Sequence, residues 1–152
     1  MKVLITGGAG YLGTVLTEEI LNRFPYAKVI IYDNLMYKQD GLFSFFKHPK
    51  DRFEFVYGDV RDKNSLLEQL QKLDKNSDYV IPLAAIVGFP ACARDEKLAT
   101  SVNFEHVKYI VQSTKCRIIY PNTNSGYGVS DGEAHCTEET PLAPISVYGR
   151  TK

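Results

Sequence analysis

A glycine cluster behind the first apolar run is the feature that most constrains the fold of this chain. Residues 2–6 (KVLIT) are typical of a buried strand, and residues 7–13 (GGAGYLG) contain a G-x-G-x-x-G spacing that starts at Gly8. Apolar side chains then recur at helical spacing from Leu12 to Ile20, and Pro25 ends that helix. Glycines between a strand and a helix let the backbone approach a bound pyrophosphate closely. The segment therefore predicts a pyrophosphate-binding turn, against the alternative of a tight turn that binds nothing.

The rest of the chain alternates short apolar runs with amphipathic stretches. Strands are predicted at 2–6, 28–32, 53–57, 79–83 and 117–120, and further helices at 42–46, from Asp62 to about 73, at 98–115 and towards 152. In the helix at 98–115 the side chains expected to point inward are Val102, Val107, Ile110 and Val111. This alternation indicates an α/β fold, a doubly wound parallel sheet of the Rossmann type, truncated after about five strands.

Composition excludes several classes of protein. The 152 residues hold 18 basic and 18 acidic side chains, and this net charge of zero argues against a nucleic-acid partner. The sequence has no apolar run that could span a membrane and no secretory signal at the N-terminus. The cysteines and histidines match neither a disulfide framework nor a metal site; they are Cys92, Cys116, Cys136, His48, His106 and His135. We therefore expect a reduced, cytoplasmic protein that binds no metal and whose histidines pack or lie on the surface.

The second predicted strand is followed by an acidic residue. Asp33 lies 20 positions after Gly13, a spacing at which a carboxylate accepts hydrogen bonds from a nucleotide ribose. A carboxylate also repels a 2′-phosphate, and segment 7–13 contains no basic residue. The pattern favours NAD over NADP, and the alternative is an ordinary acidic turn residue.

Tyr148 and Lys152 stand one helical turn apart near the end of the chain. Such residues share a face of a helix, and an ammonium beside a tyrosine hydroxyl favours the phenolate. Tyr148 could then exchange a proton with a substrate hydroxyl or carbonyl while hydride passes to or from the cofactor. The alternative for an isolated Tyr-x-x-x-Lys pair is a solvated helix face.

Together, these segments resemble the N-terminal half of the extended short-chain dehydrogenase/reductase family. The similarity is to its NAD-dependent epimerase/dehydratase members, in particular those like UDP-galactose 4-epimerase. The matching stretches follow the family's order along the chain: Thr6–Gly13, Tyr32–Leu35, Gly58–Asp62, Leu83–Ala85, Val102–Asn103, Tyr127–Gly128, and Tyr148 with Lys152.

The resemblance implies a set of cofactor contacts. They are Gly7, Gly10, Tyr11, Leu12 and Gly13 at the pyrophosphate, Asp33 and Asn34 at the adenosine ribose, Asp59 and Val60 at the adenine, Leu83, Ala84 and Ala85 along the cofactor, and Asn103 under the catalytic centre. The Asp59 carboxylate would accept a hydrogen bond from the exocyclic amine of the adenine.

The resemblance also implies the reacting groups. Thr123 would hydrogen-bond the reacting oxygen of the substrate, Tyr148 would act as acid and base, and Lys152 would bind the nicotinamide ribose and tune Tyr148. From the residues alone, Ser125 is a competing hydroxyl, and a turn this rich in Asn, Ser and Gly also forms without catalysis.

Asn124, Ser125 and Val87 depart from the family's pattern. The Asp-Glu pair that the family's dehydratases carry after the threonine is here Asn124 and Ser125, which disfavours a 4,6-dehydratase. Val87 replaces a lysine of some epimerases beside the cofactor, so retention of the cofactor between turnovers is an open question. Cys92 lies in an apolar loop at the expected sugar edge, and we expect a packed side chain and not a nucleophile.

The resemblance implies a nucleotide-sugar epimerase that transiently passes a hydride from a sugar carbon, expected at C4, to bound NAD. Two alternatives stay open: an NAD-dependent dehydrogenase or reductase of a keto-sugar or other carbonyl, and a non-catalytic dinucleotide-binding module. Since family members are considerably longer, residues 1–152 are expected to be an incomplete NAD-binding domain without the substrate domain, with little turnover alone. The full-length enzyme is expected to form a homodimer through the helices at 98–115 and from Tyr148.

Overall fold

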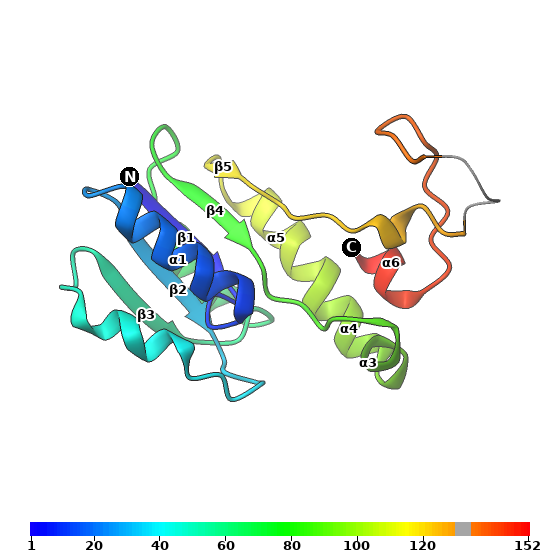
Figure 1. Ribbon diagram of the computed structural model, residues 1–152, viewed down its shortest axis with the longest axis horizontal. Coiled ribbons are helices and arrows are strands. Elements are labelled where there is room, and N and C mark those ends of the chain that lie inside the picture. Colours follow the sequence, from blue (N-terminus) through cyan, green and yellow to red (C-terminus); the bar gives the residue numbers. More distant parts are fainter. Residues whose placement is uncertain (130–134) are drawn as a thin grey trace.

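Five apolar segments form a parallel sheet at the centre of the computed structural model, which describes residues 1–129 and 135–152. The strands are β1 (Lys2–Thr6), β2 (Lys28–Asp33), β3 (Phe53–Tyr57), β4 (Tyr79–Pro82) and β5 (Arg117–Ile118). Their spatial order is β3-β2-β1-β4-β5, and every neighbouring pair is parallel (Figure 1). The chain thus winds outward in both directions from β1, which confirms the predicted doubly wound fold. In such sheets ligands bind beyond the carboxyl ends of the strands, where the strand order reverses.

Helical segments connect the strands and lie on both sides of the sheet (Figure 1). They are α1 (Tyr11–Arg23), the 3-10 turn η1 (Gly41–Lys47), α2 (Lys63–Leu70), α3 (Phe89–Arg94), α4 (Glu96–Thr100), the π-helical turn η2 (Ser101–Glu105), α5 (His106–Ser113), the 3-10 turn η3 (Asn124–Gly126) and α6 (Val147–Thr151). None of the helices in the described ranges is long and apolar enough to cross a membrane.

The alternation of side chains along the strands divides the core into two layers. Val3 and Ile5 of β1 pack with residues of α1 and η1, while Leu4 packs with residues of α2, η2 and α5. Both faces of the central strands are therefore apolar and covered, as expected for a parallel sheet between helices. Asp62 caps α2 as predicted, because its side chain accepts hydrogen bonds from the N–H groups of Asn64 and Ser65.

The predicted continuous helix at 98–115 is interrupted, and part of its expected inner face was wrong. Residues 96–113 form α4, the π-turn η2 and α5 in succession. Val111 follows Val102 by nine positions, which places it on the opposite side of a helix with about 3.6 residues per turn. His106 and Ile110 take the inward positions after η2, while Val111 is 57% exposed and Val107 is half-buried. The prediction for Val102 and Ile110 is confirmed, since both are buried.

The last strand is shorter than predicted. β5 pairs with β4 over Arg117 and Ile118 only, although the N–H of Ile119 still donates to the carbonyl of Val80 at 3.0 Å. Tyr120 and Pro121, which follow, leave the sheet and lead to the η3 turn.

Candidate functional site

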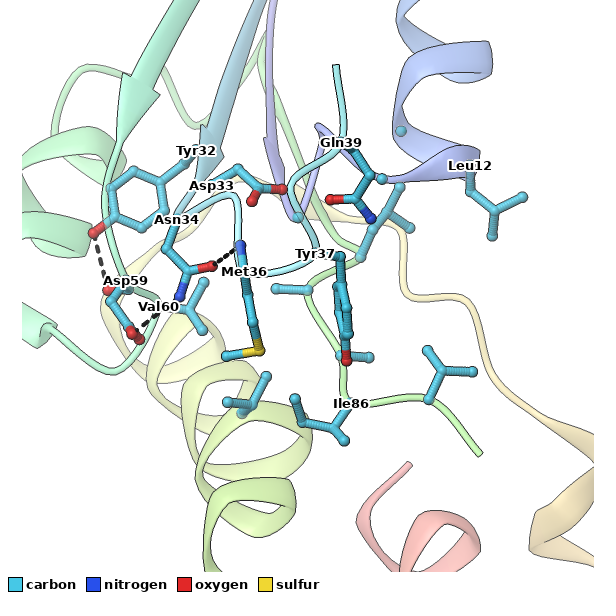
Figure 2. A pocket seen from close by; sticks show the side chains of 18 of the residues that line it. Leu12, Tyr32, Asp33, Asn34, Met36, Tyr37, Gln39, Asp59, Val60 and Ile86 are labelled. Atoms are coloured by element: carbon cyan, nitrogen blue, oxygen red, sulfur yellow. Dashed lines mark hydrogen bonds between the residues drawn. The ribbon is translucent and has the colours of Figure 1, made fainter. Parts of the chain in front are cut away.

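A cavity of about 340 Å³ opens beyond the carboxyl ends of the central strands. A site of this size lies in the range that binds small molecules. Figure 2 shows it between the loop after β2 and the segment after β4. All the cofactor residues expected from the first 85 positions line it: Gly7, Gly10, Tyr11, Leu12, Gly13, Asp33, Asn34, Asp59, Val60, Leu83, Ala84 and Ala85. Asn103, Thr123, Tyr148 and Lys152 do not line it.

The glycine turn, residues 7–13, has positions that cannot accommodate a side chain. Gly7 has a φ of +70°, and a Cβ there would lie 2.4 Å from the backbone nitrogen of Ala84. A Cβ on Gly13 would lie 2.4 Å from the carbonyl oxygen of Gly8, so α1 packs directly on the turn. No side chain caps the N-terminal end of α1 within the described part of the chain, which leaves N–H groups of its first turn free to bind an anion. Tyr11 and Leu12, whose side chains point largely into solvent, provide those groups.

Asp33 ties the end of β2 to the glycine turn. One carboxylate oxygen accepts a hydrogen bond from the N–H of Ala9 at 3.0 Å, and the other accepts one from the N–H of Leu35 at 2.7 Å. An ionised carboxylate has about four acceptor positions, so Asp33 can still accept hydrogen bonds from a ligand in the cavity. This arrangement fits ribose hydroxyl groups, which are hydrogen-bond donors.

Asp59, which lies in the loop after β3, accepts two hydrogen bonds from the Arg61 guanidinium. The Arg61 Nε donates to one carboxylate oxygen at 2.9 Å, and its Nη2 donates to the other at 2.7 Å. Asn34 donates to the same carboxylate at 3.1 Å (Figure 2). These contacts, led by the guanidinium of Arg61, lower the pKa of the Asp59 carboxyl to about 2. Asp59 is therefore a fixed negative charge at neutral pH.

The side-chain amide of Asn34 is already engaged by the protein. Its oxygen accepts from the N–H of Met36 at 3.0 Å while its nitrogen donates to Asp59. The loop after β2 also brings three cavity residues that the sequence interpretation did not include: Met36, Tyr37 and Gln39. Met36 and Tyr37 extend from this loop towards the segment after β4 (Figure 2). Their position directly after Asp33-Asn34-Leu35 was the available signal, but the path of an irregular loop is not encoded in any periodicity.

The segment after β4 forms an apolar wall, and Asn103 holds it in place. Asn103 is 1% exposed; its oxygen accepts from the N–H of Ile86 at 2.8 Å, and its nitrogen donates to the carbonyl of Ile86 at 3.0 Å. The same nitrogen lies 3.2 Å from the hydroxyl of Thr151 in α6. Asn103 therefore links the π-turn, the cavity wall and the helix that carries Tyr148.

His106, one helical turn after Val102, packs against the end of β1. Its Nδ1 contacts the carbonyl oxygen of Val102, and its Nε2 lies 3.4 Å from the hydroxyl of Thr6 at the end of β1. Burial lowers the pKa of His106 to about 4. The ring is therefore a neutral packed group, in line with the interpretation of the histidines as packing or surface residues.

Cys92 is also a packed side chain. It is fully buried, and its thiol donates to the carbonyl of Ile86 at 3.2 Å. Burial raises the pKa of the Cys92 thiol, which disfavours the reactive thiolate. Within residues 1–129 and 135–152 no group of three metal-ligating side chains forms.

The elements that carry the expected reacting groups, α6 and the η3 turn, contact each other outside the cavity lining. α6 packs on α3, α4, η2 and the η3 turn, and a Cβ on Gly149 would lie 2.5 Å from the carbonyl oxygen of Ser125. This contact sets the turn that follows Thr123 against the helix that bears Tyr148. The Thr123 hydroxyl donates to the Ser125 hydroxyl at 3.2 Å, so the two competing hydroxyls are neighbours.

Tyr148 and Lys152 occupy successive turns of one helical segment, since the N–H of Lys152 donates to the carbonyl of Tyr148 at 3.1 Å. The Lys152 side chain is half-buried, and burial lowers its pKa. Its Nζ lies 4.3 Å from the ring centroid of Tyr120. The predicted one-turn spacing of the pair is thus observed, with an ammonium taken partly out of water.

Known proteins resemble this chain over its whole length. A model of the NAD dependent epimerase/dehydratase family matches residues 3–152. The low-salt glycan biosynthesis protein Agl12 of Haloferax volcanii is 30% identical over 159 residues, covering 100% of this chain and 48% of that protein. The chain spans about half the length, or less, of the curated relatives it matches.

Solved structures give the same picture. DesIV, a dTDP-glucose 4,6-dehydratase from Streptomyces venezuelae with NAD bound, superposes with a TM-score of 0.87 at 28% identity, over 100% of this chain and 48% of that one. UDP-glucuronic acid 4-epimerase from Bacillus cereus, in complex with NAD, superposes with a TM-score of 0.82 at 27% identity, over 99% of this chain and 48% of that one.

Proposed function

The chain belongs to the NAD dependent epimerase/dehydratase family, and from this premise we propose that it is the NAD-binding part of a nucleotide-sugar epimerase. The proposed reaction oxidises one sugar carbon, C4, and reduces it again on the other face. One observation carries the proposal: the glycine turn, Asp33 and Asp59 surround a single cavity at the switch point of the sheet.

The residues present fit a dinucleotide. The N–H groups of Tyr11 and Leu12 would bind the pyrophosphate, because no side chain of the described residues caps that end of α1. Asp33 would accept hydrogen bonds from the adenosine ribose. The anionic Asp59 and the backbone of Val60 would bind the adenine against the apolar wall of the segment after β4. NAD is favoured over NADP because the Asp33 carboxylate repels a 2′-phosphate.

The reacting end would work by moving one proton. NAD, when bound, supplies a reversible hydride acceptor. Tyr148 would take the proton of the sugar hydroxyl during oxidation and return it during reduction, while the Lys152 ammonium stabilises the phenolate. Thr123 would donate a hydrogen bond to the reacting oxygen. Because the sugar is first oxidised and then reduced, the cofactor ends the cycle as it began and no external oxidant is consumed.

The η3 turn favours an epimerase over a dehydratase. Asn124 and Ser125 follow Thr123, and neither side chain is a carboxylic acid that could donate a proton to a leaving hydroxyl group. Elimination of water from a sugar needs such a group beside the reacting carbon. The family includes both activities, and this difference is the reason to choose between them.

We also propose the partners of the whole protein. Its substrate would be a nucleotide-linked sugar. Two copies would associate through the helical segment at 98–115, where η2 exposes Phe104 and α5 exposes Val111, and through the helix beginning near Tyr148. The net charge of zero supports the absence of a nucleic-acid partner, and we propose a cytoplasmic location because the three cysteines match no disulfide framework. This chain alone is proposed to bind NAD with little turnover.

Two measurements test the proposal. Calorimetry should detect NAD binding to residues 1–152. In the whole protein, a nucleotide-sugar should be converted to its epimer without net formation of reduced cofactor, and Tyr148→Phe should lower kcat by at least about a hundredfold while NAD binding persists. Net accumulation of reduced cofactor would favour a dehydrogenase. Undiminished activity of Tyr148→Phe would overturn the assignment of Tyr148.

A further inference from the structure

Tyr120, which follows β5, contacts Lys152 in two separate ways. Its hydroxyl donates a hydrogen bond to the backbone oxygen of Lys152 at 3.2 Å. Its ring centroid lies 4.3 Å from the Lys152 Nζ, well within the range of a cation–π contact. One half-buried side chain thus engages both the main chain and the charged end of the same residue.

The ring is a particular kind of partner for an ammonium. None of the ion pairs formed by the described residues involves Lys152, so no carboxylate neutralises its charge there. A carboxylate would hold the ammonium but would also cancel its field at a neighbouring phenol. An aromatic face attracts the ammonium through its quadrupole and adds no net charge. Lys152 can therefore be fixed and remain fully able to stabilise a phenolate.

The other titratable groups around the contact support this arrangement. Burial, and after it the neighbouring Tyr148, raises the pKa of Tyr120, so Tyr120 stays a neutral phenol. From α5 the charge of Lys152 acts on His106, whose pKa burial already lowers to about 4, so that ring is neutral at physiological pH. Of Tyr120, His106 and Lys152, Lys152 is therefore the group that carries a charge, and it stands one helical turn from Tyr148.

We propose that Tyr120 is a positioning residue for the reaction: its ring holds the Lys152 ammonium, one helical turn from Tyr148, without supplying a counter-charge. The inference rests on the proposed function, in which Tyr148 transfers the proton and Lys152 tunes it. Tyr120 itself touches neither cofactor nor substrate in this role.

The test compares Tyr120→Leu and Tyr120→Phe in the whole protein. Leucine removes the ring, so the acid limb of the pH profile of kcat should move about one unit towards higher pH, with a roughly tenfold loss of kcat on that limb. Phenylalanine keeps the ring and should leave the acid limb close to that of the wild type. The affinity for ADP should be unchanged in both variants, since Tyr120 does not line the cavity. Tyr120→Met, an unbranched apolar replacement, serves if the leucine variant does not fold.

Tyr109→Leu is the matched control. Tyr109 lies on α5 and carries Lys63 over its ring at 5.5 Å, so the variant loses a similar contact away from α6. Its pH profile should not move. An unshifted acid limb in both Tyr120→Leu and Tyr120→Met would overturn the inference. If Tyr148→Phe also kept full activity, the proposed function would fail as well, so the two failures are distinguishable.

Discussion

The two ends of the proposed site differ in how they are built. The adenosine end, formed by the glycine turn, Asp33 and Asp59, rests on loops that leave neighbouring strands of one sheet, and hydrogen bonds connect those loops to one another. The reacting end, formed by Thr123, Tyr148 and Lys152, stands on a three-residue turn and a five-residue helix. Parallel strands preorganise the first end. The second depends on a few long-range contacts made by single side chains.

Residues of the π-turn and α5 connect the two ends. Asn103 hydrogen-bonds Ile86 in the cavity wall and Thr151 in α6. His106 contacts Thr6, which directly precedes the glycine turn. Asn103 and His106 are three positions apart, so both lie on the inner face of this helical segment. Damage to the adenosine end should therefore abolish cofactor binding, whereas damage to the connection should loosen the reacting end first.

The largest effect is expected from Gly13→Ala. The new Cβ would lie 2.4 Å from the Gly8 carbonyl oxygen, so α1 must move off the turn. Such overpacking costs up to about 3 kcal/mol, and NAD affinity should fall at least about a hundredfold. Calorimetry measures the NAD affinity of this variant. Gly41→Ala is the control, because its Cβ would meet only the Thr14 side chain at 3.3 Å. Equal NAD affinity in the two variants would show that the turn does not hold the cofactor.

Acid should destabilise the connection through His106. The folded chain keeps the imidazole neutral down to about pH 4, whereas the unfolded chain protonates it from 6.5. The unfolded state therefore binds more protons between these values, and the free energy of unfolding should fall by about 3 kcal/mol as the pH drops through them. Asp59, with a pKa of about 2 in the fold against an ordinary 3.8, adds a loss only at lower pH.

Denaturant unfolding at a series of pH values measures this effect. His106→Gln cannot be protonated, so its stability should change much less between neutral pH and pH 4. A variant that loses stability as steeply as the wild type would place the acid sensitivity elsewhere.

Asn103→Ala separates the two ends. It leaves the N–H of buried Ile86 without a partner and the Ile86 carbonyl with the Cys92 thiol in place of two donors, and it should lower the free energy of unfolding by about 2 kcal/mol. Hydrogen exchange should quicken in α6 and around Ile86, while affinity for ADP stays near that of the wild type. Asn64→Ala, at an exposed position of α2, is the control. A loss of ADP binding equal to the loss of α6 protection would mean that the two ends form one cooperative unit.

The smallest effect is expected from Asp33→Asn. The amide keeps one acceptor oxygen but loses the charge that strengthens hydrogen bonds from ribose hydroxyls, so NAD should bind about tenfold more weakly. Discrimination against NADP should narrow, because the repulsion of the 2′-phosphate is gone. Titrations with both dinucleotides measure this, beside the exposed control Asp51→Asn. An unchanged ratio of the two affinities would remove Asp33 from cofactor selection.

The two ends also differ in how far sequence alone predicts them. The strand, glycine turn and helix at 2–23 follow from local spacing, and so does Asp33 at the end of the second strand, because each signal lies within a few residues. Val111 was wrongly placed inward because a residue nine positions after Val102 lies on the opposite side of a helix, and His106 takes the inward place between them. No local pattern predicts the π-turn at Ser101–Glu105.

Loop conformations and contacts between distant segments were beyond prediction. The clamp of Arg61 on Asp59 depends on a loop conformation, and the pairing of Tyr120 with Lys152 joins residues 32 positions apart. Met36 and Tyr37 line the cavity only because of the path of an irregular loop. Such features arise from tertiary packing, which single-sequence periodicity does not report.

A crystal structure of residues 1–152 with NAD tests the central claim most directly. The account predicts pyrophosphate oxygens within hydrogen-bond distance of the N–H groups of Tyr11 and Leu12, the adenosine ribose on Asp33, and the nicotinamide ring on the side of Tyr148. A dinucleotide bound in the reverse direction, or away from the glycine turn, would contradict it.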